Sequence, residues 1–156
     1  MSEEKQPQYT SHFEHSLDDR NRISIPSEWR FAHGSEDMLL AVQKVGPNGN
    51  FIQLLPPAIA AQLKAKFDAI PFFDQAGQAA KEDFYSKSQQ VWFDKAGRIL
   101  LNENLLKHAG IKLAKGEPVM LRGSGSTFSI YAASAWAASE ARGPVDHTQT
   151  LSRLAI

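Results

Sequence analysis

Apolar residues in this chain are gathered in short runs that turn-forming residues separate. Runs of this length suit β-strands, because a helix of a globular domain usually needs about ten residues or more. Glycine, asparagine or serine between two such runs is typical of a β-hairpin. The pattern predicts two hairpins, with strands at 38–42 and 51–55 around Gly46-Pro-Asn-Gly and strands at 118–121 and 128–131 around Gly123-Ser-Gly-Ser.

The spacing of apolar residues becomes helical after the first hairpin. Short helices are expected before each hairpin, because Ser27 and Asn102 favour helix N-caps and Gly110 suits a helix end. Residues 74–83 are polar and predict no definite element, and the segment 140–146 reads as a break before a tail that is either amphipathic or disordered. The residues whose spacing predicts one apolar helix face are Ile59, Leu63, Phe67 and Ile70.

The sequence also repeats itself at a fixed distance. An Asp-x-x-x-Arg-Ile motif occurs twice, and each copy precedes a predicted short helix, a hairpin and a helical stretch. The shift between the copies is 94 − 18 = 76 residues. Two copies of one supersecondary unit are the natural interpretation. The matching pairs are Asp18 and Asp94, Arg22 and Arg98, and Ile23 and Ile99.

Each Asp-x-x-x-Arg motif has the chemistry of a tight turn. An Asp at a strand end accepts hydrogen bonds from backbone N–H groups two or three residues later. The fourth turn residue needs a left-handed conformation, which Gly97 adopts freely and Asn21 tolerates. Each arginine then either folds back on the Asp of its own turn or points outward. A purely structural interpretation is a capped turn with a local ion pair, which contributes about 0–1 kcal/mol.

The presence of the same turn twice, with further cations inside it, favours anion binding. Arg20 and Lys95 lie within the two turns, and an Asp that holds a neighbouring Arg in place improves its contact with an anion. A lone hairpin is marginally stable in water, so the two units are expected to interleave with pseudo-two-fold symmetry. The expected organisation is a flexible N-terminal extension at 1–10, a first unit at 11–72, a linker at 73–84, a second unit at 85–138 and a C-terminal tail at 139–156.

Composition narrows the function classes. The 17 basic residues balance 17 acidic ones, so the chain is not a polycation that coats nucleic acid, and DNA binding would depend on local placement of Arg and Lys. The absence of cysteine excludes disulfides and thiolate chemistry and suits a cytosolic protein. The N-terminus has no apolar core of a signal peptide, and no apolar run approaches the roughly 18 residues that span a bilayer.

Motifs for catalysis are not recognisable. His12, His15 and Asp18 have a spacing that suggests metal ligands, but residues three apart on a strand point to opposite faces. The segment Arg122-Gly-Ser-Gly-Ser lacks the Gly-Lys-Ser/Thr ending of a phosphate-binding loop and precedes a strand. No serine stands in a nucleophile motif with a paired His and Asp. We therefore expect a protein that is not an enzyme, with no metal, no cofactor and no small-molecule substrate.

The two motifs and their surroundings resemble the MraZ family of bacterial regulators, within residues 11–138. The resemblance implies an α+β fold in which two pseudo-symmetric β-rich halves form a swapped-hairpin barrel with short helices, as in AbrB-like regulators. It also implies a ring-shaped homo-oligomer, cytoplasmic and nucleoid-associated, that binds double-stranded DNA upstream of the division and cell-wall gene cluster. Asn21 and Asn102 depart from the family pattern, which usually has Gly and Pro there. The matching segments are 15–26, 94–101, 108–111, 119–123, 128–131 and Trp136.

The candidate site follows from the motifs. Asp18, Asn21, Asp94 and Gly97 are expected to shape the turns. The zero net charge leaves an alternative function, a protein-interaction or scaffold module that uses the same fold. The histidine spacing leaves a third, a small hydrolase or metal enzyme. The residues expected to contact DNA are Arg20, Arg22, Arg30, Lys95 and Arg98.

Overall fold

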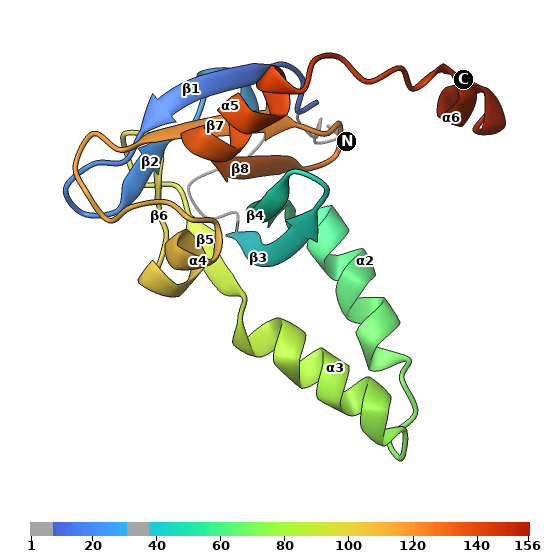
Figure 1. Cartoon of the computed structure of the whole chain (residues 1–156). Helices are drawn as coiled ribbons and strands as arrows, with labels where there is room; N and C mark the ends of the chain where they lie inside the picture. Colours follow the sequence, from blue (N-terminus) through green and yellow to red (C-terminus); the bar gives the residue numbers. More distant parts are fainter. Residues whose placement is uncertain (1–7, 31–37) are drawn as a thin grey trace, which may run out of the picture.

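The computed structural model describes residues 8–30 and 38–156. It has the expected α+β architecture, with a 6-stranded sheet, a 2-stranded sheet and short helices (Figure 1). The strands are β1 (His12–Ser16), β2 (Arg22–Ser24), β3 (Met38–Gly46), β4 (Gly49–Leu55), β5 (Gln89–Trp92), β6 (Arg98–Leu100), β7 (Pro118–Gly123) and β8 (Phe128–Ala132). The helices are α1 (Ser27–Arg30), α2 (Pro57–Asp68), α3 (Gln75–Ser86), α4 (Glu103–His108), α5 (Ala133–Ala141) and α6 (Thr148–Arg153).

The larger sheet interleaves the two halves of the sequence. Its strand order is β1-β7-β8-β4-β3-β5, and all neighbouring strands are antiparallel. The predicted hairpins β3–β4 and β7–β8 form its centre. Each outer strand pairs with the hairpin of the other half: β1 lies beside β7, and β5 lies beside β3. Across the described residues, strand pairing gives two sheets and does not close them into the expected barrel.

The main core lies between the two sheets and collects side chains from both halves. Ile23 of β2 and Ile99 of β6 are fully buried in it. Trp29 of α1 fills the neighbouring space, and its ring centroid lies 5.0 Å from that of Phe128 and 5.7 Å from that of Tyr9. Because β2 and β6 alternate between buried and exposed positions, their other side chains point away from this core.

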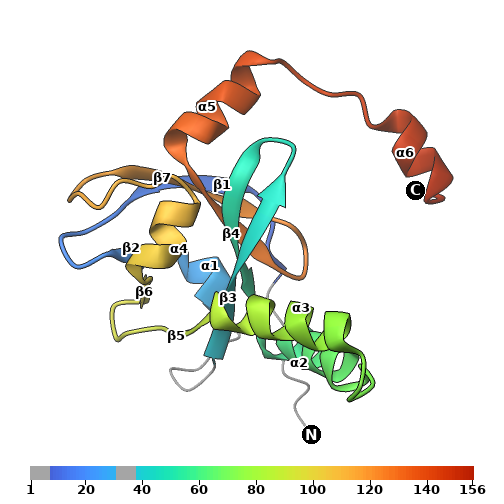
Figure 2. The ribbon, with the colours of Figure 1, turned by 60° about the horizontal axis from the view of Figure 1, so that its bottom comes forward.

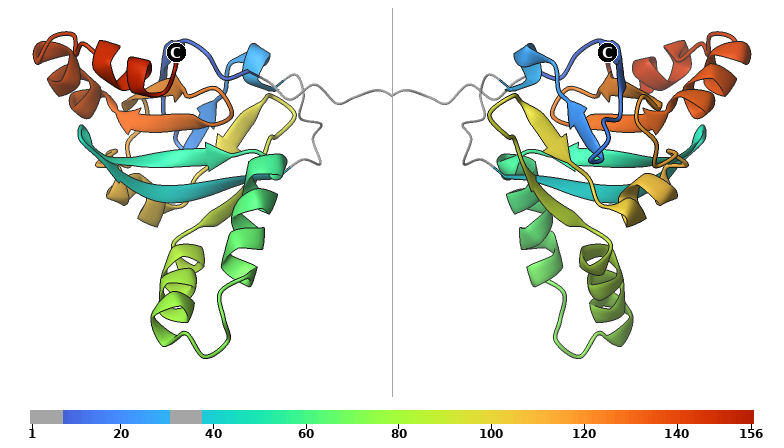
Figure 3. Two further views of the ribbon diagram at one scale, coloured as in Figure 1. Left: turned by 90° about the vertical axis from the view of Figure 1, so that its right-hand side faces the viewer. Right: turned by 90° about the vertical axis from the view of Figure 1, so that its left-hand side faces the viewer.

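A second, smaller core holds two helices against the sheet. Helices α2 and α3 extend from the body side by side (Figures 1 and 3). Ile59 and Leu63 of α2 pack with Leu40, Val42 and Leu55, which confirms this part of the predicted apolar face, whereas Ile70 lies beyond the end of α2. The two helices contact each other through aromatic rings. Most of the expected linker at 73–84 is therefore part of a helix, which the polar sequence did not predict.

Local capping signals have the effects that the sequence predicts at α4. Asn102 accepts a hydrogen bond from the backbone N–H of Leu105 at 2.9 Å. Gly110 follows the helix with a φ of 71°. The tail contains the short helix α6, which lies apart from the sheets (Figures 1 and 2). None of the helices in the described part of the chain is long and apolar enough to cross a membrane.

Candidate functional site

The first Asp-x-x-x-Arg motif forms a turn that its aspartate holds together. Oδ1 of Asp18 accepts hydrogen bonds from the backbone N–H groups of Arg20 (2.9 Å) and Arg22 (2.8 Å). Oδ2 of Asp18 accepts a hydrogen bond from Nε of Arg22 at 2.7 Å. Asn21 completes the turn with a φ of 61°, in the left-handed region that asparagine tolerates. The arginine therefore folds back on the aspartate of its own turn.

The second motif has the same hydrogen bonds. Oδ1 of Asp94 accepts the backbone N–H groups of Ala96 and Arg98, both at 2.9 Å, and Oδ2 accepts Nε of Arg98 at 2.9 Å. Gly97 occupies the left-handed position with a φ of 75°. Nη1 of Arg98 also lies 3.8 Å from Oδ2 of Asp18. This contact links the charges of the two turns.

The hydrogen bonds keep both aspartates in their charged form. Burial alone would raise the pKa of the Asp18 carboxyl, but hydrogen bonds from Arg22 and Arg20 outweigh this effect and hold the pKa below its ordinary value of 3.8. The backbone hydrogen bond from Arg98 is the main cause of the lowered pKa of Asp94. A carboxylate that accepts several N–H groups is stabilised as the anion. Both turns therefore retain their ion pairs at neutral pH.

The strands that follow the two turns pair with each other. β2 and β6 form an antiparallel ladder in which Ile23 lies opposite Ile99. Two backbone hydrogen bonds extend this ladder, and they are related by the shift of the motifs, since 101 − 25 = 76 and 97 − 21 = 76. The two turns thus lie at opposite ends of one short ribbon. The bonds run from Ile25 N–H to the Gly97 carbonyl (3.1 Å) and from Leu101 N–H to the Asn21 carbonyl (3.2 Å).

The cations of the two turns differ in exposure. Arg20 and Lys95 are exposed at the turn tips. Arg22 and Arg98 are partly buried, with 24% and 32% of their side chains accessible to solvent. Arg20 and Lys95 thus present positive charge on freely exposed side chains. Arg22 and Arg98 present guanidinium groups in a defined orientation.

Arg30 lies against the second turn, although the sequence places it just after the first. Its Nη1 donates a hydrogen bond to the carbonyl of Ala96 at 3.3 Å. A Cβ atom on Gly97 would overlap this guanidinium. Glycine therefore suits position 97 for two reasons: it adopts the left-handed backbone freely, and it leaves the space that the Arg30 side chain takes.

Two residues of the ribbon, Ser24 and Leu100, were not among the sites predicted from the sequence. The ladder places Arg22 opposite Leu100 and Ser24 opposite Arg98. All four side chains belong to the outer face, because the alternate residues Ile23 and Ile99 face the core. The repeat itself contained the signal, since Ser24 and Leu100 are also 76 positions apart.

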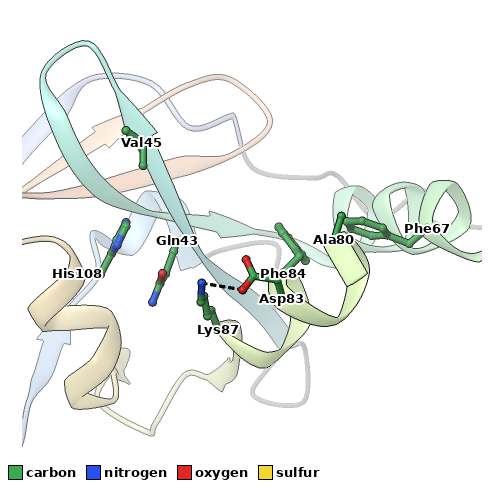
Figure 4. A pocket seen from close by; sticks show the side chains of 8 residues that line it. All are labelled: Gln43, Val45, Phe67, Ala80, Asp83, Phe84, Lys87 and His108. Carbon is green, nitrogen blue, oxygen red and sulfur yellow. Dashed lines mark ion pairs between the residues drawn. The ribbon is translucent and has the colours of Figure 1, made fainter. Parts of the chain in front are cut away.

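A pocket elsewhere shares no residue with the turns. It has a volume of about 440 Å³ and lies between α3, β3 and α4 (Figure 4). Inside it, Nζ of Lys87 lies 2.7 Å from Oδ1 of Asp83. This ion pair joins neighbouring turns at the end of α3 and explains those charges without a ligand. The lining residues are Gln43, Val45, Phe67, Ala80, Asp83, Phe84, Lys87 and His108.

The two histidines whose spacing suggests metal ligands lie on β1. The ring of His12 lies 5.0 Å from that of Trp136, and His15 is partly buried on β1. Within residues 8–30 and 38–156, no group of three or more His, Asp or Glu side chains is arranged to hold a metal ion.

The interleaved sheet and the joined turns define a class: an α+β protein in which two Asp-x-x-x-Arg turns share one ladder. A family model described as "MraZ protein, putative antitoxin-like" matches residues 84–153. A protein of Acetivibrio thermocellus named Transcriptional regulator MraZ is 30% identical over 124 residues, which cover 80% of each chain. Proteins with that name from Leuconostoc mesenteroides (23% identity, 83% of this chain and 85% of that one) and Rickettsia rickettsii (24%, 79% and 80%) also match. This chain belongs to the MraZ family.

Proposed function

We propose that this protein is a sequence-specific DNA-binding transcriptional regulator and not an enzyme, and that its two joined turns contact the duplex. The observation that carries the proposal is the β2–β6 ribbon, which has one arginine-bearing turn at each end. The major groove of B-DNA admits a two-stranded β-ribbon. The names of the relatives, which describe transcriptional regulators, support the proposal.

The local charge suits this role although the whole chain is neutral. Residues 18–30 and 94–98 contain five cations and four acids, a balance of 5 − 4 = +1, whereas the net charge of the chain is zero. Local positive charge draws a polyanion to one face of a neutral protein. The cations are Arg20, Arg22, Arg30, Lys95 and Arg98, and the acids are Asp18, Asp19, Glu28 and Asp94.

We assign different roles to the exposed and the held cations. Arg20 and Lys95, at the turn tips, contact phosphates and position the protein. Arg22 and Arg98, whose Nε atoms are bound by aspartates, direct their remaining N–H groups to guanine edges. The aspartates and the left-handed residues of the turns act indirectly, by holding the arginines in place.

The finer expectations from the family belong to this proposal. The exchange of β1 and β5 between the halves supports the swapped-hairpin arrangement. Both of these strands are at the ends of the sheet order, and exposed strand edges favour association with another copy. A ring-shaped homo-oligomer would place several ribbons on repeated DNA elements, so that avidity strengthens binding. The proposed target is the promoter of the division and cell-wall gene cluster, which would make the protein cytoplasmic and nucleoid-associated.

Affinity measurements on the turn arginines test the proposal. The DNA is a labelled fragment from upstream of the division and cell-wall gene cluster of the source organism. Arg22→Ala and Arg98→Ala should each weaken binding by about 1–3 kcal/mol for the guanine contact that is removed. Arg142→Ala is the matched control, because Arg142 is bonded to Asn48 of the β3–β4 hairpin and not to either Asp-x-x-x-Arg turn. Wild-type affinity in both turn variants, once folding and assembly are verified, would place the DNA surface elsewhere, and no shift of the fragment at low salt would contradict DNA binding.

A second candidate function is a protein-interaction or scaffold module. The zero net charge favours it, as do Phe72 and Phe73 between α2 and α3, which are 82% and 90% exposed. A stable protein partner that is recovered by the wild-type chain and lost with Phe72→Ser and Phe73→Ser, together with no protection of DNA, would favour this alternative over the first.

A further inference from the structure

The outer face of the β2–β6 ribbon carries different side chains at its two ends. In the β2–β6 ladder, Leu100 lies opposite Arg22, and Ser24 lies opposite Arg98. Directly opposed residues of an antiparallel pair have Cβ atoms about 5 Å apart. One arginine therefore has an apolar neighbour, and the other has a hydroxyl.

The apolar side is exposed and held in position. Leu100 is 53% exposed, and Trp92, which precedes the second turn, is 49% exposed. The equivalent residues of the first half, 76 positions earlier, are Ser24 and Ser16, both exposed. The side chain of Gln89 donates to the Leu100 carbonyl at 3.1 Å and accepts the N–H of Asn102 at 2.9 Å. Gln89 thus holds the backbone that follows the Leu100 side chain, at the carbonyl of Leu100 and at Asn102.

We infer that Leu100 is a specificity-determining residue, which contacts the methyl group of a thymine next to the base that Arg22 reads. This inference rests on the proposed DNA-binding function. In the major groove thymine displays a C5-methyl group, and apolar side chains recognise it. The occupant is a duplex because the leucine shares its face with two arginines and lies between two cation-bearing turns. Ser24 beside Arg98 lacks this apolar contact, so the sequence that one chain reads is not a palindrome.

The test removes only the methyl groups. The promoter fragment is prepared once with thymine and once with uracil in its place. The wild-type chain should bind the uracil DNA about fourfold more weakly for each methyl group that it contacts, the effect of burying one methyl-sized group. Leu100→Ser should bind the two fragments equally. Ser24→Leu should increase the preference for thymine. Leu113→Ser, which changes an exposed leucine outside the ribbon (41% exposed), should behave as the wild type.

The outcomes separate this inference from the proposed function. Equal affinity of the wild-type chain for both fragments, with Arg22→Ala still impaired, overturns the role of Leu100 and leaves DNA binding intact. A thymine preference that persists in Leu100→Ser assigns the methyl contact to another residue and also overturns the role of Leu100. A change of subunit number in Leu100→Ser but not in Leu113→Ser, measured by light scattering, identifies the leucine as a contact between copies instead. No binding of either fragment by the wild-type chain overturns the proposed function and this inference together.

Discussion

Ile23 and Ile99 lie opposite each other in the β2–β6 ladder, and neither has any surface accessible to solvent. The two residues belong to different halves of the sequence, and each follows the arginine of its own turn. Their contact therefore joins the two motifs, and the stability of the chain depends on it.

Truncation of this pair should be costly. Ile23→Ala and Ile99→Ala should each lower the free energy of unfolding by about 2–5 kcal/mol, because each leaves a cavity in a packed core. The loss of unfolding free energy in the double variant should differ from the sum of the two single losses by about 0.5 kcal/mol or more, because the two cavities adjoin. Denaturant unfolding of the four proteins measures this coupling. Leu151→Ala, at an exposed position, is the control, and strictly additive losses would show that the two isoleucines act independently.

The two left-handed positions should respond differently to substitution. Gly97→Ala should lower the free energy of unfolding by about 1–3 kcal/mol, because it strains the backbone. Displacement of the Arg30 side chain by the new Cβ atom should add to this loss. Asn21→Gly should change it by less than about 1 kcal/mol, because glycine adopts the same φ freely. Adding Arg30→Ala to Gly97→Ala should recover the part of the loss that comes from overlap. A loss that is the same with and without Arg30 would mean that backbone strain alone makes glycine necessary.

The turn aspartates should make stability depend on pH. Their pKa values are lowered in the folded chain relative to 3.8, so their contribution is present above that value and is lost as the pH falls through the lower, folded pKa values. Asp18→Asn combined with Asp94→Asn should be less stable than the wild type at pH 7. The difference should shrink as the pH falls below 3.8 and should vanish below the lowered pKa values of the folded chain, where the wild-type carboxyls also lose their charge. Thermal unfolding of both proteins from about pH 2 to about pH 7 measures this stability difference. A difference that stays constant over the whole range would contradict the prediction.

Salt dependence should distinguish the two kinds of cation. Arg20→Ala and Lys95→Ala should weaken binding to all DNA sequences alike and reduce the slope of log affinity against log salt by about one. Arg22→Ala should mainly reduce discrimination between the promoter fragment and unrelated DNA of equal length. Titrations at several salt concentrations with both DNAs measure the two effects. Loss of discrimination in Lys95→Ala, with an unchanged slope, would reverse the assignment of roles.

Local sequence determined the parts of the site that form within a few residues. The left-handed conformations of Asn21 and Gly97, the hairpin at Gly46–Gly49 and the cap by Asn102 follow from backbone preferences and short-range hydrogen bonds. These could be predicted because donor, acceptor and turn residue lie within about four positions of one another. The shift of 76 residues likewise identifies equivalent positions in the two halves from the sequence alone.

Local rules left the elements without a strong pattern undetermined. Helix α3 was not predicted, because its sequence is polar and contains few large apolar residues. Its N-cap, Asp74, accepts the N–H of Gly77 at 2.9 Å, and Phe84 packs against Phe67 of α2 with ring centroids 5.1 Å apart. Packing on a neighbouring helix can stabilise a polar helix that has only a few apolar side chains to bury.

Tertiary structure alone decided how the two units meet. The sequence allowed the arginines to fold back or to point outward, and it placed Arg30 near the first turn. The fold directs Arg22 and Arg98 onto their own aspartates and carries Arg30 to the second turn. These outcomes depend on contacts between residues far apart in the chain. Ordering such residues costs conformational entropy, and burial of a shared core, such as that around Ile23 and Ile99, offsets this cost.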